Sequence, residues 1–110
     1  MPTHADVRRC ALSLPEACEA PHFEATSFRV NKKIFCTMGE NGAGIVLKLA
    51  PEDQHNLAAD DSQAIKPVAG YWGRSGWTDV QIAGMAEERL HNLLRMSWAL
   101  VAPKRLLKAP

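Results

Sequence analysis

Thr26-Ser27-Phe28-Arg29-Val30-Asn31-Lys32-Lys33-Ile34-Phe35-Cys36-Thr37-Met38 is the stretch that decides the fold of this 110-residue chain. In residues 26–30 the even positions are apolar or β-branched and the odd positions are polar, which is typical of a strand with one buried face. Residues 31–33 supply a turn, and the mostly apolar segment 34–38 follows directly. The stretch therefore predicts a β-hairpin with a basic tip.

Three further strands are predicted after the hairpin. Residues 39–44 are rich in glycine and predict a second turn, and the uniformly aliphatic odd positions of residues 45–49 predict a third strand. Residues 64–68 predict a short fourth strand at a sheet edge, because Pro67 cannot donate a ladder hydrogen bond. Residues 77–82 alternate apolar and polar side chains and predict a fifth strand.

Three helices are predicted around these strands. Thr3 can cap a first helix, which Pro15 ends. Pro51 at a first helical position opens a short second helix through about Ala59. The last helix has the strongest pattern, is expected to pack across the sheet, and stops at Pro103. Its apolar side consists of Leu90, Leu93, Leu94, Ser97, Trp98 and Val101.

The order of these elements is helix, three strands, helix, two strands, helix. Residues 15–24 contain two prolines and three glutamates without a period, so a connecting loop is expected there. Such an order favours an α+β fold with an antiparallel sheet over a doubly wound parallel one. At this length we expect one domain over residues 1–110, able to fold without disulfides or metal.

The composition is that of an ordinary soluble protein, with 46% hydrophobic and 23% charged residues. No apolar run approaches the roughly 18 residues that a membrane span requires, and the N-terminus lacks the pattern of an export signal. We therefore expect a cytoplasmic protein without a membrane partner. In that reducing compartment Cys10, Cys18 and Cys36 would remain thiols.

The densest group of aromatic residues is Gly70-Tyr71-Trp72-Gly73-Arg74-Ser75-Gly76-Trp77. Glycines around bulky rings describe a tight loop that holds the aromatic faces at fixed positions. Two interpretations are open. Either Tyr71, Trp72 and Trp77 close one end of the core, or they form an exposed binding surface.

Five stretches together resemble the MmcQ/YjbR family of small bacterial proteins over nearly the whole chain. They are Leu14-Pro15-Glu16-Ala17, Ser27-Phe28-Arg29-Val30-Asn31-Lys32-Lys33-Ile34-Phe35, Leu49-Ala50-Pro51-Glu52-Asp53, the segment Gly70 to Trp77, and Trp98-Ala99-Leu100-Val101-Ala102-Pro103-Lys104-Arg105. The resemblance implies a compact α-β(3)-α-β(2)-α fold of the secretion-chaperone-like and frataxin-like kind. It also implies DNA binding, attributed to a doubly winged arrangement of the sheet.

The leading functional prediction is DNA binding without catalysis, and it depends more on the resemblance than on charge. Cations neutralise phosphates and release counterions, and an exposed Tyr71 or Trp72 could stack on an unpaired base. The net charge of +1 supplies little long-range attraction. The candidate cations lie on the hairpin, the aromatic stretch and the C-terminal tail: Arg29, Lys32, Lys33, Arg74, Lys104, Arg105 and Lys108.

The alternative is a small-molecule- or protein-binding adaptor that uses the segment Gly70 to Trp77. Here Tyr71, Trp72 and Trp77 would hold a flat apolar ligand, and Arg74 would pair with its carboxylate or phosphate. Such a module would be a monomer or a homodimer. Low sensitivity of binding to salt would favour it over DNA binding.

The signals for catalysis or a metal are weak. Cys18-x-x-x-His22 could supply two zinc ligands, but no second pair with suitable spacing is present. Cys10 and Cys36 fall on apolar faces, where a buried thiol is the ordinary interpretation. With no Ser-His-Asp or phosphate-loop pattern either, we expect no enzymatic activity, no cofactor and no metal.

Overall fold

Six antiparallel strands form one sheet in the computed structural model, which describes residues 3–22, 25–39 and 44–107. The strand order is β1-β2-β3-β4-β6-β5. The strands are β1 (Cys18–His22), β2 (Ala25–Val30), β3 (Lys33–Met38), β4 (Gly44–Lys48), β5 (Ile65–Pro67) and β6 (Trp77–Gln81). The helices are α1 (His4–Leu12), α2 (Pro51–Asp60), α3 (Tyr71–Arg74), α4 (Glu87–Val101) and α5 (Lys104–Leu107). The predicted α+β fold with an antiparallel sheet is confirmed.

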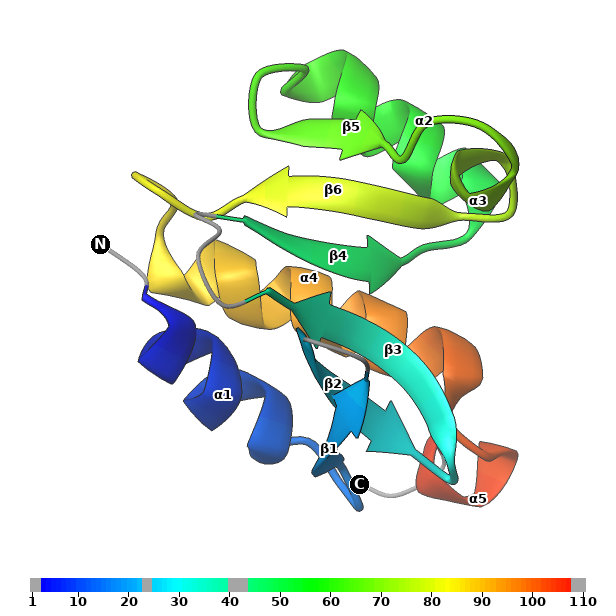
Figure 1. Ribbon diagram of the computed structural model, residues 1–110. Coiled ribbons are helices and arrows are strands. Elements are labelled where there is room, and N and C mark those ends of the chain that lie inside the picture. Colours follow the sequence, from blue (N-terminus) through cyan, green and yellow to red (C-terminus); the bar gives the residue numbers. More distant parts are fainter. Residues whose placement is uncertain (1–2, 23–24, 40–43, 108–110) are drawn as a thin grey trace.

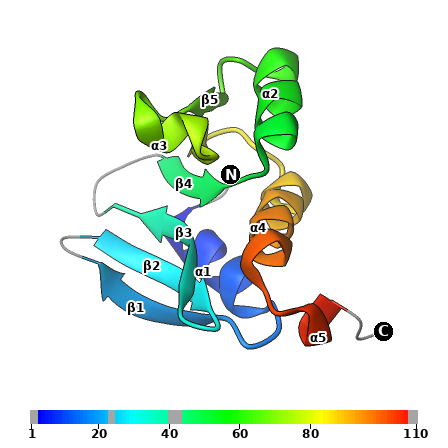
Figure 2. The same ribbon diagram turned by 90° about the vertical axis from the view of Figure 1, so that its right-hand side faces the viewer.

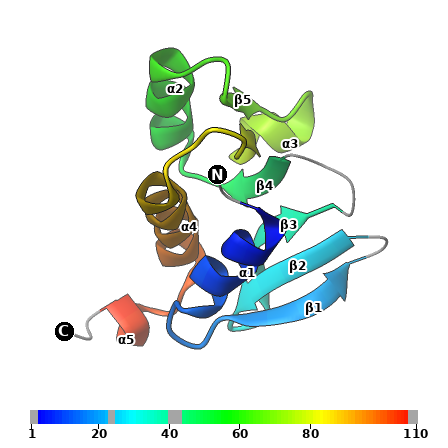
Figure 3. The same ribbon diagram turned by 90° about the vertical axis from the view of Figure 1, so that its left-hand side faces the viewer.

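The two faces of the sheet are covered unequally. Figure 1 shows α4 behind the strands, and the turned views in Figures 2 and 3 place α1 and α2 on that same side. Among the described elements, the short α3 is the helix that lies on the opposite side, at one end of β6. The opposite face, which we call the open face, is therefore largely free of helices.

The core lies between the sheet and helices α1 and α4. Leu90, Leu93, Leu94 and Trp98 of α4 are buried, as the helical spacing predicts, and Ser97 is buried with them. The Trp98 indole N–H donates a hydrogen bond of 3.0 Å to the carbonyl of Pro15. The strands contribute side chains such as Phe28, Phe35, Leu47 and Val80, all fully buried.

The start of α1 follows from its sequence. Thr3 accepts a hydrogen bond from the Asp6 backbone N–H, and the Asp6 carboxylate accepts one of 2.8 Å from the Thr3 N–H. This reciprocal capping box satisfies two backbone donors that a helix start leaves free. The same bond to the Thr3 backbone is the largest cause of the lowered pKa of Asp6.

The predicted hairpin is formed by β2 and β3. Its register pairs Phe28 with Cys36 and Arg29 with Ile34, so Phe35 is the extra residue of a β-bulge. The turn residues Asn31 and Lys32 have φ values of 52° and 67°, as a two-residue turn that follows the strand twist requires. A lysine at a position that favours glycine strains the backbone.

Replacing the strained lysine should stabilise the protein. We expect Lys32→Gly to raise the free energy of unfolding by up to about 1 kcal/mol, because glycine removes the Cβ clash of left-handed backbone. Urea denaturation would measure the change. The matched control is Lys33→Gly, in extended strand backbone, which should lower stability by about 0.5–1 kcal/mol. An equal loss in both variants would contradict the expectation.

The sheet opens between β3 and β4. These strands pair over three positions, from Cys36↔Leu47 to Met38↔Ile45, and β3 then curves away from β4 (Figure 1). Ser97 of α4 bridges the opening: its Oγ accepts the Lys48 N–H at 3.1 Å and donates to the Phe35 carbonyl at 2.5 Å. A helix side chain thus replaces ladder hydrogen bonds where the strands diverge.

Three predicted connections need correction. The loop expected over residues 15–24 is wrong, because Cys18–His22 form the edge strand β1. The prolines and glutamates of this segment break the alternating pattern of a strand, and the strand forms because it pairs with β2. Ser27 Oγ donates a hydrogen bond to the Ala20 carbonyl, and the Arg29 guanidinium donates one to the Pro21 carbonyl. The aromatic loop contains α3, and the tail contains α5. The expected turn at residues 39–44 falls mainly outside the described residues.

Candidate binding groove on the open face

Helix α3 is fixed in place by close backbone packing. A Cβ atom on Gly73 would lie 1.7 Å from the carbonyl oxygen of Val68, so α3 contacts the end of β5 where a side chain cannot fit. Gly76, at φ 110°, packs closely against the chain after β4, because a Cβ there would lie 2.2 Å from the Leu49 carbonyl oxygen. The Leu49 N–H donates to the Gly76 carbonyl at 2.8 Å. These contacts require glycine at both positions.

A buried glutamine of α2 ties the same segment to the sheet. The Gln54 side-chain N–H groups lie 3.0 Å from the carbonyl oxygens of both Gly73 and Trp77, and 2.9 Å from Thr78 Oγ1. Thr78 in turn donates to the Gly76 carbonyl. Because Gln54 is buried, these hydrogen bonds face little competition from water. They hold the C-terminal part of α3 and the start of β6.

The firmly held helix presents aromatic rings to solvent. The exposed fraction is 68% for Tyr71 and 60% for Trp72, and the two rings meet edge to face with centroids 5.7 Å apart. Trp77 is half-buried at the start of β6. Of the two interpretations left open by the sequence, closure of the core is therefore wrong for Tyr71 and Trp72, and exposure is correct.

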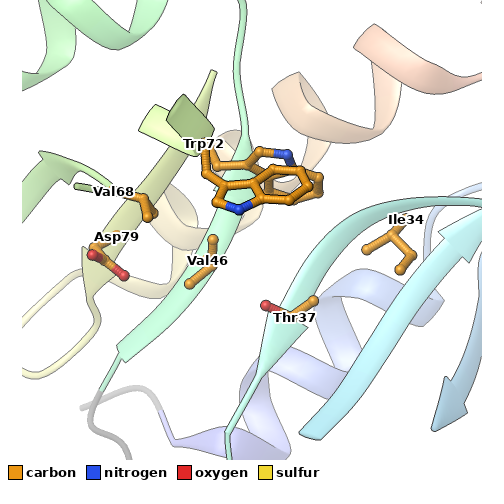
Figure 4. Close-up of a pocket in the computed structure, with 7 residues that line it drawn as sticks. Ile34, Thr37, Val46, Val68, Trp72 and Asp79 are labelled. Atoms are coloured by element: carbon orange, nitrogen blue, oxygen red, sulfur yellow. The ribbon is translucent and has the colours of Figure 1, made fainter. Parts of the chain in front are cut away.

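A groove of about 410 Å³, which we call the aromatic groove, runs over the open face beside α3. It is lined by Ile34, Thr37, Val46, Val68, Trp72, Trp77 and Asp79. Figure 4 shows the Trp72 indole above Val46, with Val68 and Asp79 on one side and Ile34 and Thr37 on the other. These residues share one face because Thr37 pairs with Val46, and Val46 pairs with Asp79, across neighbouring strands.

Polar groups in the groove are few and separated. Thr37 contributes a hydroxyl at one side and Asp79 a carboxylate at the other. Lys66 is the cross-strand neighbour of Asp79 on β5, but no cation of the described residues lies within salt-bridge distance of that carboxylate. A ligand in the groove would thus find an available acceptor at the Asp79 end.

The cations predicted from the sequence are not gathered at one place. Arg29 lies along the open face, where its guanidinium donates to Ser27 Oγ at 2.9 Å and to the Pro21 carbonyl. Arg74 lines a separate depression with Gln54 and Pro67. Lys32 and Lys33 are exposed at the hairpin tip.

The C-terminal cations lie on α5. Arg105 forms a two-bond ion pair with Glu16, at 2.5 and 2.8 Å, which raises the pKa of Arg105 and lowers that of Glu16. Lys104 is exposed, and Lys108 lies outside the described residues. Arg105 is therefore already paired, whereas Lys104 is open to solvent.

One basic residue that the sequence did not single out lies beside the groove. Lys48 is the cross-strand partner of Trp77, and its Nζ lies 5.9 Å from the centre of the Trp77 ring. Lys48 and Lys33 line a second depression of about 450 Å³, which we call the lysine hollow. Its other lining residues are Leu49, Ala50, Pro51, Ser75, Leu100 and Val101. The sequence does contain a signal for the position of Lys48: it lies two residues after Val46, and residues at this spacing share one face of a strand.

Comparison with known proteins assigns the family. A family model described as YjbR matches residues 12–100 of the 110-residue chain. The chain belongs to the YjbR family. The crystal structure of Deinococcus radiodurans protein DR2400, described by the family-model domain DUF419, matches with a TM-score of 0.80 and 27% identity over 92% of this chain and 79% of that one. No curated protein matches the YjbR chain.

The thiols of this YjbR protein are separated from the groove. Cys10 and Cys36 are buried, as predicted, and burial raises the pKa of both thiols. Cys18 is exposed on β1.

Within the described ranges, no three His, Cys, Asp or Glu side chains lie close enough together to hold a metal ion. In the same part of the YjbR chain, no helix combines the length and the apolar character needed to cross a membrane.

Proposed function

We propose that this YjbR protein is a non-enzymatic binding module that holds a small ligand with a flat ring in the aromatic groove. The observation that carries the proposal is the exposure of Trp72 on a helix that close packing at Gly73 and a hydrogen bond from Gln54 hold against the sheet. Exposed apolar surface costs about 25 cal/mol per Å², so a fixed, solvent-facing indole is unfavourable unless a partner covers it.

The shape and lining of the groove support a small ligand. Its volume of about 410 Å³ lies within the range of about 300–1,000 Å³ that is usual for small-molecule sites. Apolar side chains form most of the lining, and the two polar groups, Thr37 and Asp79, are placed to orient a ligand rather than to bind it strongly. Stacking on Trp72 would supply the main attraction.

Removing the exposed indole should abolish most of this binding. We expect Trp72→Ala to weaken the affinity for flat ring compounds such as adenosine or quinoline by about five- to 150-fold, since stacking on an aromatic side chain contributes about 1–3 kcal/mol. Isothermal titration calorimetry would measure the affinity without depending on tryptophan emission. Leu12→Ala, which truncates a partly exposed apolar side chain on α1, is the control and should bind normally. Unchanged affinity in Trp72→Ala would refute the proposal.

DNA binding is the second candidate, favoured by the exposed pair Lys32 and Lys33 at the hairpin tip. It has less support from geometry, because Arg29 and Arg105 already have protein partners and Arg74 lies in a separate depression. Fluorescence anisotropy of labelled duplex DNA at about 50 and 200 mM salt would test it, since phosphate contacts weaken steeply over this range. Salt-sensitive binding that a Lys32/Lys33 double alanine variant loses would favour DNA.

A further inference from the structure

The aromatic groove and the lysine hollow adjoin one another. On β4, Val46 lines the groove and Lys48, on the same strand face, lines the hollow. On β3, Ile34 lines the groove, while its neighbour Lys33, on the opposite strand face, lines the hollow together with Leu100 and Val101 of α4. Val46 and Lys48 are two residues apart on β4, which covers about 7 Å, so along this strand the two sites are separated by the length of a small linking group. Trp77 lines the groove with Lys48 Nζ beside its ring.

The aromatic groove and the lysine hollow together, which we call the combined site, are positively charged at one end and negatively charged at the other. Lys33 and Lys48 are the charged residues that line the hollow, and Asp79 is the charged residue that lines the groove. Glu52 and Asp53 follow Pro51 on α2 but are exposed and not part of the lining of the hollow. A complementary ligand therefore carries an anionic group at the hollow and an N–H donor at the Asp79 end.

From this arrangement we infer that the ligand class is a single nucleotide: a flat base in the aromatic groove and a phosphate arm at Lys33 and Lys48. The inference rests on the proposed function, because the base needs the Trp72 ring. Asp79 accepts a hydrogen bond from an amino or ring N–H group of the base, and the sugar spans the step from groove to hollow. Lys48 and Lys33 act as point charges on the phosphate.

A single nucleotide fits this site better than a nucleic acid strand. A strand would carry further phosphates past the groove, where the described lining residues offer the carboxylate of Asp79 rather than a cation. With a net charge of +1, the chain also exerts little attraction on a polyanion. The two lysines match the charge of one phosphate group.

The experiment compares adenosine with adenosine monophosphate as probes, titrated calorimetrically into the full chain at about 50 mM salt. We expect the monophosphate to bind about tenfold more tightly, because a charge-assisted contact is strong relative to a neutral one. In a Lys33→Met/Lys48→Met double variant the preference for the monophosphate should disappear, so that the two probes bind equally. Methionine keeps an apolar stem of similar length. Lys104→Met, on α5, is the control and should retain the tenfold preference.

Each outcome separates the two proposals. Equal binding of both probes by the wild type would overturn the nucleotide assignment and leave the ring-binding groove intact. Binding of neither probe, nor of quinoline, would overturn the proposed function as well. An adenine oligonucleotide that binds more tightly than the monophosphate, with a further loss in Lys32→Ala, would overturn the single-nucleotide occupant in favour of a strand.

Discussion

A Gly73→Ala variant will unfold at a clearly lower urea concentration than the wild type, with a loss of about 3 kcal/mol. The added Cβ would lie 1.7 Å from the Val68 carbonyl oxygen, which belongs to the backbone and cannot rotate away. Either α3 must shift away from β5, which breaks the Gln54 hydrogen bond to the Gly73 carbonyl, or the end of β5 must move. Urea denaturation followed by circular dichroism measures the loss.

Alanine variants of two other glycines serve as controls, because they separate the effect of this steric overlap from the effects of the added methyl group and of backbone strain alone. Gly39 has open space around it, so Gly39→Ala should change stability by less than about 0.5 kcal/mol. Gly84 has open space but a φ of 78°, so Gly84→Ala should lose about 1–2 kcal/mol from backbone strain alone. If Gly73→Ala were as mild as Gly39→Ala, α3 would not be fixed in the way that the groove requires.

The second large effect is expected at Ser97. A Ser97→Ala variant leaves the Lys48 N–H and the Phe35 carbonyl without the hydroxyl that satisfies both of them inside the protein. Each buried backbone group left unpaired costs about 1–3 kcal/mol, so we expect a total loss of about 3 kcal/mol. Thermal and urea denaturation would both report it.

The control lies on the same helix. Asn92 is exposed on α4, and Asn92→Ala should be neutral or slightly stabilising because alanine has the higher helix propensity. Ser97→Ala has the same gain in helix propensity. A net loss of stability in that variant therefore comes from the two lost hydrogen bonds and exceeds the propensity gain. Stability equal to that of Asn92→Ala would show that water satisfies the two backbone groups after the change.

The elements with a clear period were predictable from the sequence, and those that depend on distant contacts were not. The hairpin, β4 and α4 can be recognised in the sequence because their buried residues recur at every second position or at helical spacing. β1 does not, since it is an edge strand containing Pro21 and its pairing with β2 decides its conformation. α3 has four residues, too short for a periodic signal, and is held by Gln54 from another helix.

The candidate site was predicted in its aromatic residues but not in its charges. Tyr71, Trp72 and Trp77 stood out by composition, yet only the packing at Gly73 determines that Trp72 points to solvent. Whether a basic residue is available depends on its partner, and the partner of Arg105 lies 89 residues away in the sequence. No local pattern reports such a pairing.

The two ends of the sheet affect how copies of the chain meet in a concentrated solution. Each edge strand contains a proline, Pro21 in β1 and Pro67 in β5, and a proline lacks the N–H group that a newly added strand would need. Aggregates that grow by edge-to-edge strand pairing, including amyloid-like fibrils, are therefore disfavoured at both ends. Crowding would instead bring molecules together through the exposed rings of Tyr71 and Trp72, so occupancy of the groove should also improve colloidal solubility.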